Sequence, residues 1–155
     1  MVEAALRRMT DESVGASSRL AKSFPNFARA YGAEPARKWQ MEIQDQLLEC
    51  AKLPEDWDSY GSQPSGWDAG LFALSLLNDF MRPRTPIPQV VPSSAGGIQL
   101  EWHQKGVDLE LHITGPYKCE VWFKDHRAPD QLPVSLDLTD DYSALRRPFE
   151  LLTNR

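Results

Sequence analysis

Acidic and histidine side chains alternate with aliphatic ones between residues 97 and 124, and carboxylates with imidazoles are what a metal site or acid–base pair requires. Alternation along a strand places these polar side chains on one face of a predicted sheet. The candidates for a metal-binding or metal-dependent catalytic site are Glu101, Glu110, His112 and Glu120. We favour the alternative of a solvated sheet face, because a half-buried strand needs polar residues there whether or not they react.

The chain lacks the motifs that usually accompany catalysis. There is no Walker loop, Gly-x-Gly-x-x-Gly, His-Glu-x-x-His or zinc-ligand spacing. The serines at 59, 62 and 65 lack the Gly-x-Ser-x-Gly setting of a serine hydrolase. Cys50 and Cys119 lie far apart on apolar stripes, which indicates buried free thiols. The sequence therefore predicts a protein that is not an enzyme and has no cofactor.

One aromatic side chain, Trp122, falls on the same predicted face as Glu110 and Glu120. An aromatic residue among charged ones is either covered by another segment or contacts a partner. In the N-terminal segment, Leu20 and three aromatic residues recur at helical intervals, although Pro25 interrupts them, and such a segment can order on contact. The predicted partner-binding residues are therefore Trp122, Phe24, Phe27 and Tyr31.

A short aromatic and acidic segment, Trp-Asp-Ser-Tyr-Gly at residues 57–61, lies between Pro54 and Pro64. Asp56 and Asp58 could act as paired acids, but aspartates in tight loops also accept hydrogen bonds from backbone amides. We favour the structural role, as a loop that pins two helices together. Its predicted structural residues are Trp57, Asp58, Tyr60 and Gly61.

Apolar spacing predicts the elements that position these residues. Helices are expected over about 36–51 and 65–82, the second capped by Ser65 with Asp68. Prolines limit 89–91 to a sheet edge that could accept a further strand. Strands are expected at about 97–103, 107–114 and 118–124, with another possible at 134–138. Asp140 or Asp141 is expected to begin a last helix, which Pro148 kinks or ends.

Together these elements predict an α+β fold, with two helices followed by a three- to five-stranded, mainly antiparallel meander sheet and a C-terminal helix. Keeping apolar faces together pairs Leu100 with Leu109, which places Glu101 opposite Asp108. The same rule places His112 beside Glu120.

A length of 155 residues suits one domain with a core, so we expect an N-terminal arm at 1–34, partly flexible or helical, and a single α+β domain at 35–155. The longest apolar stretch is much shorter than the roughly 20 residues that cross a bilayer, and no secretory signal is visible. The expected location is the cytoplasm. The net charge of −5 disfavours nucleic acid and suits a basic protein partner.

Two segments resemble a group of small bacterial proteins of unknown function. They are the run Leu53-Pro-Glu-Asp-Trp-Asp-Ser-Tyr-Gly-Ser-Gln-Pro64 and, after a helix, Pro88-Gln-Val-Val-Pro92 with Gly96-Gly-Ile-Gln-Leu-Glu-Trp102. Those proteins look like "NWDGYGA-P" followed by "GGI-LEW". Ser59 stands where their pattern has glycine, and the likeness covers about residues 47–124. The resemblance implies a fold and supplies no activity.

We therefore expect a non-enzymatic protein-binding module, such as an antitoxin, an immunity protein or a phage-defence accessory protein that masks a protein partner. Two alternatives stay open. One is the metal-binding or metal-dependent enzyme described above. The other is an assembly protein, a homo-oligomer whose N-terminal arm exchanges between subunits.

Overall fold

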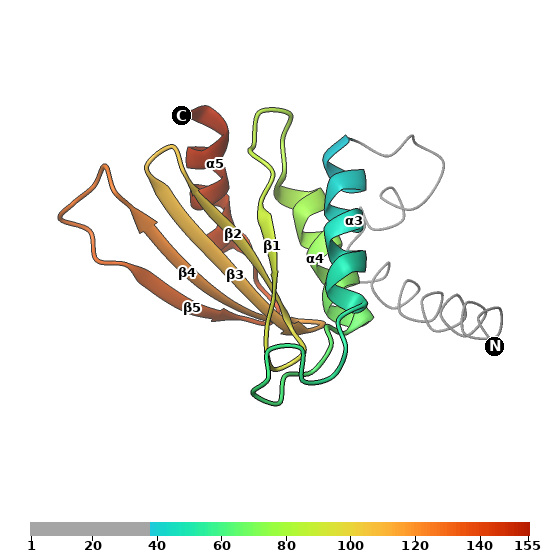
Figure 1. The fold of residues 1–155 in the computed structure, drawn as a ribbon. Coiled ribbons are helices and arrows are strands. Elements are labelled where there is room, and N and C mark those ends of the chain that lie inside the picture. The colour runs from blue at the N-terminus through green and yellow to red at the C-terminus, as the bar shows by residue number, and fades with distance from the viewer. Residues whose placement is uncertain (1–37) are drawn as a thin grey trace.

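The computed structural model describes residues 38–155, which form three α-helices, a short 3₁₀ turn and five strands (Figure 1). The predicted boundary between arm and domain lies outside the described residues. The elements in chain order are α3 (Lys38–Ala51), α4 (Trp67–Phe80), β1 (Gln89–Pro92), β2 (Ile98–Gln104), β3 (Val107–Gly115), β4 (Lys118–Asp125), β5 (Val134–Leu138), the 3₁₀ turn η1 (Ser143–Leu145) and α5 (Arg146–Asn154).

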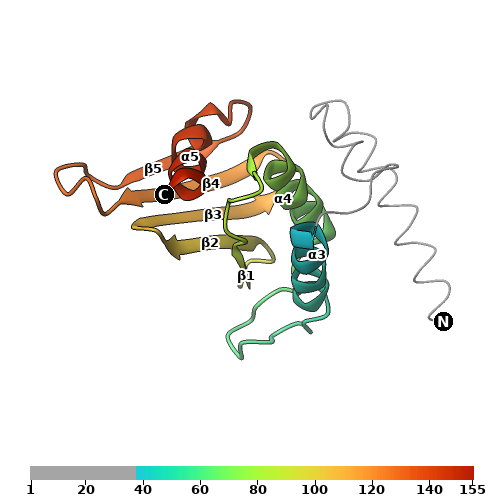
Figure 2. The same cartoon turned by 90° about the horizontal axis from the view of Figure 1, so that it is seen from above.

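The five strands form one antiparallel meander in the spatial order β1-β2-β3-β4-β5. Helices α4 and α5 pack on its apolar face, and α3 lies beside α4 and the edge strand β1 (Figure 2). The α+β fold predicted from the sequence is confirmed. Because all described helices that touch the sheet centre share one face, the opposite face keeps its polar side chains toward solvent.

Aromatic contacts fix the position of α5 over the sheet. The rings of Phe149 in α5 and Trp102 in β2 meet edge to face with centroids 5.2 Å apart, and Phe80 of α4 stacks on Phe149 at 5.3 Å. Trp102 is fully buried, and its Nε1 donates to the Pro86 carbonyl at 2.8 Å. This bond satisfies the polar end of a buried indole, as burial requires.

The predicted register was right across one turn and wrong across the other. His112 pairs with Glu120 as expected, whereas Leu100 pairs with Leu111, and Glu101 with Glu110, two residues from the predicted partners. The reason is a two-residue turn at Lys105-Gly106, where φ is 57° and 73°. Two successive positive φ angles are typical of the type I′ turns that match strand twist. The prediction centred this turn one residue too early.

Two predictions at helix ends were also wrong. Gly66 rather than Ser65 precedes α4, and no side chain caps it. Instead, the Ser65 hydroxyl donates to the Gly97 carbonyl at 3.1 Å. Pro148 lies in the first turn of α5, where a missing amide hydrogen costs nothing, so it neither kinks nor ends that helix.

The two segments that carry the family resemblance form one structural unit. The Gln63 amide donates to the Ser94 carbonyl at 2.9 Å, and the Gly66 amide donates to the Gly96 carbonyl at the same distance. With the Ser65 bond, these contacts attach the loop after α3 to the start of β2. The loop therefore pins the helices to the sheet, whereas the sequence predicted only a pin between two helices.

Candidate functional site

The sheet face opposite α4 and α5, which we call the polar face, holds most of the candidate residues. Its central members come from adjacent strands and are paired across them: Glu101 with Glu110, His112 with Glu120, and Trp122 with both Glu110 and Ser135. Among residues 38–155, no helix covers this face at its centre. The period-2 pattern thus places the predicted acidic, histidine and tryptophan side chains together on one exposed surface.

A hollow of about 200 Å³ lies on the polar face around Trp122. Trp122 is half-buried in it, between β3 and β5. Strand residues line the whole hollow, so no other described segment covers the indole. The lining residues are Gln99, Glu110, His112, Glu120, Val121, Trp122 and Ser135.

Hydrogen bonds hold the walls of this hollow. Gln99 Nε2 donates to Glu110 Oε2 at 3.2 Å. His112 Nε2 lies 3.0 Å from the Ser93 hydroxyl, and its Nδ1 lies 3.7 Å from Glu120 Oε2. Of the four residues predicted for a metal or catalytic site, the structure brings Glu110, His112 and Glu120 to the hollow. In the described part of the chain, no three histidine, cysteine or acidic residues lie close enough to hold a metal ion.

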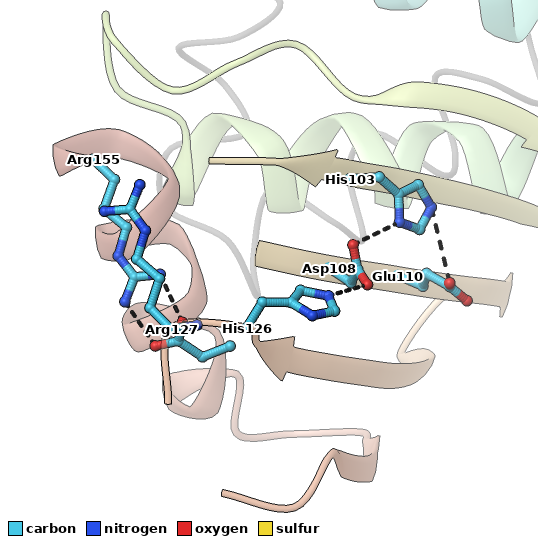
Figure 3. Close-up of polar contacts among 7 residues, drawn as sticks. His103, Asp108, Glu110, His126, Arg127 and Arg155 are labelled. Atoms are coloured by element: carbon cyan, nitrogen blue, oxygen red, sulfur yellow. Dashed lines mark hydrogen bonds and ion pairs between the residues drawn. The ribbon is translucent and has the colours of Figure 1, made fainter. Parts of the chain in front are cut away.

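The fourth, Glu101, belongs to a second group farther along the same face, the His103 cluster of Glu101, His103, Asp108, Glu110 and His126. Figure 3 shows the last four of these side chains. Asp108 accepts from both rings, with Oδ2 2.6 Å from His126 Nε2 and Oδ1 3.0 Å from His103 Nδ1. Glu101 lies 3.5 Å from the other nitrogen of His103.

Electrostatics within the His103 cluster favour a charged imidazole. The hydrogen bond from His103 to Asp108, with the nearby charges of Asp108, Glu101 and Glu110, raises the pKa of His103 despite its partial desolvation. Hydrogen bonds from both histidines lower the pKa of Asp108, although desolvation opposes this. Both rings remain nearly half exposed. The cluster can therefore hold a proton at the surface of the sheet.

Sequence reasoning missed His126 as a member of this cluster. His126 follows the last residue of β4, where its amide donates to the Gly106 carbonyl at 2.9 Å. The pairing of His112 with Glu120 was predicted correctly, and extending that register places Val107 opposite Asp125. One further residue brings His126 to the Lys105-Gly106 turn, so the signal was available in the sequence.

Next to the His103 cluster, a buried ion pair joins α5 to the sheet (Figure 3). The two terminal guanidinium nitrogens of Arg155 each donate to the Asp125 carboxylate at 2.7 Å. The Arg127 backbone amide donates to the same carboxylate at 3.0 Å. The Asp125 side chain is only 3% exposed. These bonds lower the pKa of Asp125 to about 2.

The loop after α3 uses its polar groups on itself. Asp58 Oδ1 accepts from the amides of Tyr60 at 2.8 Å and Ser62 at 3.3 Å, which lowers the pKa of Asp58. Asp56 Oδ1 accepts from the Gly61 amide at 2.7 Å, and Trp57 Nε1 donates to the Gln63 carbonyl at 3.2 Å. These bonds are those of a structural loop. The Tyr60 ring is 93% exposed, so only its backbone contributes.

Ser59 adopts φ 64°, the left-handed conformation that glycine tolerates best. Ser59→Gly is therefore expected to raise the free energy of unfolding by up to about 1 kcal/mol, because it removes the Cβ strain. Urea unfolding of the full chain measures the change. Ser59→Ala keeps the Cβ and is the control; a gain of equal size in that variant would contradict the explanation.

Phe24, Phe27 and Tyr31, the other predicted partner-binding residues, lie outside the described residues. Comparison of the chain with protein-family models, curated proteins and solved structures found no significant match. The resemblance drawn from the two sequence segments thus stays a prediction. Within residues 38–155, every helix is too short or too polar to cross a membrane.

Proposed function

We propose that this chain is a non-enzymatic protein-binding module that binds a positively charged segment of a protein partner on its polar face. The observation that carries the proposal is the hollow around Trp122, which a half-buried indole lines together with Glu110 and Glu120. A lysine or arginine side chain suits this arrangement, because it gains a cation–π contact and a carboxylate partner together.

The shape of the hollow supports an anchoring role for Trp122. Tryptophan is enriched among the few interface residues that contribute most of a binding energy, and such residues lie in pockets surrounded by polar groups. The net charge of −5 adds long-range attraction for a basic partner. Masking of such a partner is what an antitoxin, an immunity protein or a phage-defence accessory protein does, and these are the roles we propose for the chain.

Strand addition at β1 is a less favourable mode of binding than the sequence suggested. The Val90 amide of this edge strand already donates to Gln46 Oε1 of α3 at 3.0 Å. β1 is also only four residues long and ends in Pro92. A short, proline-ended and partly capped edge is a usual protection against strand pairing. The polar face is therefore the surface that we assign to the partner.

Trp122→Ala is expected to reduce recovery of the specific partner at least about tenfold, because loss of an anchoring tryptophan typically costs about 2 kcal/mol or more. The measurement is affinity purification of the tagged full chain from its native host, with quantitative mass spectrometry. Tyr60→Ala, which removes an exposed aromatic ring that does not line the hollow, is the matched control. Unchanged recovery with Trp122→Ala would exclude this surface.

Charge and metal dependence separate the proposal from its main alternative. Joint replacement of Glu110 and Glu120 by glutamine should also reduce recovery, and added salt should weaken the wild-type interaction. Metal analysis of protein purified without added metal addresses the alternative site at Glu101, Glu110, His112 and Glu120. A stoichiometric metal that is lost in His112→Ala would favour the metal-binding function instead.

A further inference from the structure

A second surface feature lies between α3 and α4. The two helices lie side by side (Figure 1). Residues of both helices line an apolar groove of about 180 Å³. We call it the α3–α4 groove. Its lining residues are Gln44, Leu47, Leu48, Trp67, Gly70, Leu71 and Leu74.

The α3–α4 groove has an exposed apolar rim. Leu48 is 39% exposed, Trp67 is 40% exposed, and Met41, which precedes the groove residues of α3 on the same helix, is 58% exposed. Met41 and Leu48 lie on α3 together with its core stripe, and Trp67 is the first residue of α4. A clustered apolar surface of this kind marks a binding site for another apolar surface. Gly70 forms the floor, where a Cβ would lie 3.6 Å from Leu47 and 3.5 Å from Ile98.

The chain itself carries a matching apolar stripe. Leu20, Phe24, Phe27 and Tyr31 recur at helical spacing in the segment that precedes α3. Only residues 32–37 separate Tyr31 from Lys38, and six residues can span at most about 20 Å. From Lys38 to Leu48, ten residues of helix cover about 15 Å. The tether is therefore long enough for the stripe to fold back along α3, and its length suits a connection between antiparallel helices.

Charge also fits this pairing. Residues 13–33 contain three basic side chains, Arg19, Lys22 and Arg29, and no acidic one. On α3, the exposed acidic residues Glu42, Asp45 and Glu49 follow the rim stripe around the helix. A basic, aromatic segment lying along the groove would place its positive side chains beside these acidic residues at the groove edge. Opposite charges side by side favour this docking over contact with a surface of like charge.

We propose that the α3–α4 groove binds residues 20–31 of the same chain, with Phe24, Phe27 and Tyr31 inserted between the helices. The segment that was expected to order on contact with a partner then orders on its own domain. This docking is independent of the function proposed for the polar face, because the groove and the Trp122 hollow share no lining residue.

A photoreactive amino acid at position 27 of the full-length chain tests the docking. After irradiation of the purified protein, cross-links are expected within one chain to groove residues such as Leu48, Trp67 or Leu71. Leu48→Glu should reduce this cross-link about tenfold, since a buried charge displaces the aromatic residue. Leu132→Glu changes an 86% exposed leucine outside the groove and should leave it unchanged.

Each other outcome overturns the assignment. Cross-links that join two chains to the same residues would show that a second copy supplies the segment, as in the arm-exchange alternative, and light scattering would then report the dimer. Absence of cross-links to the groove in both wild type and Leu132→Glu would show that the segment does not dock there. Trypsin provides a second measurement, because cleavage after Arg29 should be about tenfold faster in Leu48→Glu than in wild type.

Discussion

Gly97→Ala is expected to lower the free energy of unfolding by about 3 kcal/mol, close to the upper range for forcing an added methyl group into a packed site. Gly97 is buried immediately before β2, where the neighbouring strand β3 passes close to its backbone. A Cβ at this position would lie 2.6 Å from the Ile113 carbonyl oxygen and 3.2 Å from the Thr114 Cα. Both are backbone atoms, so no flexible side chain can move aside.

The effect should extend beyond the local clash. The Gly97 carbonyl accepts from the Ser65 hydroxyl at 3.1 Å and from the Ser93 amide at 3.0 Å. A shift of this backbone therefore disturbs the attachment of the loop after α3 to the sheet as well as the first pair of β2. The loss combines overpacking with weakened hydrogen bonds, and both lower the free energy of unfolding.

Gly115→Ala is the matched control, because it adds the same methyl group at the end of β3 where nothing lies within 4 Å. Its free energy of unfolding should stay within about 0.5 kcal/mol of wild type. Thermal and urea unfolding of the two variants and the wild-type chain provide the comparison. If both variants lose the same stability, the loss is a general effect of alanine in a strand, and the close approach of β3 to Gly97 is not its cause.

The strong alternation of Ile98, Leu100 and Trp102, and of the corresponding residues in β3 and β4, made most of the sheet predictable. Successive side chains of a strand point to opposite faces of the sheet, so the alternation predicts the face of each residue. It places Trp122 on the same face as Glu110 and Glu120. The register between β2 and β3 was harder to predict from the sequence. It depends on Lys105 adopting a positive φ, which residue type alone does not indicate.

Contacts between distant segments account for what the sequence could not show. The loop after α3 and the Gly96-Gly97 pair are each recognisable alone, but the bonds from Gln63, Ser65 and Gly66 that join them depend on how α4 packs on the sheet. The α3–α4 groove is a similar case. Met41 and Leu48 are exposed on α3, and their juxtaposition with Trp67 exists only in the folded chain.

The helix arrangement explains why the polar face is open. α4 and α5 occupy the apolar face, and α3 lies beside the edge strand β1, where Gln46 caps the Val90 amide. The described helices thus leave the polar side of β2, β3 and β4 uncovered, with Trp122 near its centre. Within the described residues, Trp122 is buried only by the walls of its hollow.

Asp125→Ala should destabilise the fold by about 2 kcal/mol, because it removes three charge-assisted hydrogen bonds from a site that is 3% exposed. Arg155→Ala should also destabilise, since it leaves the buried carboxylate unpaired. The double variant should lose less stability than the sum of the single variants, because the two residues share one interaction. Asp137→Ala, at an exposed position in β5, is the control and should cost little.

The same pair predicts a specific dependence on pH. Asp125 has a pKa of about 2 in the folded chain and an ordinary value of 3.8, so its contribution is fully present above pH 3.8. That contribution is lost as the pH falls toward 2, because protonation then favours the unfolded chain. Asp125→Asn should therefore flatten the fall in the free energy of unfolding between about pH 4 and pH 2, relative to wild type. An equally steep fall in that variant would assign the acid sensitivity to other carboxylates, and would leave the attachment of α5 to the sheet to the packing of Phe149 on Trp102 of β2.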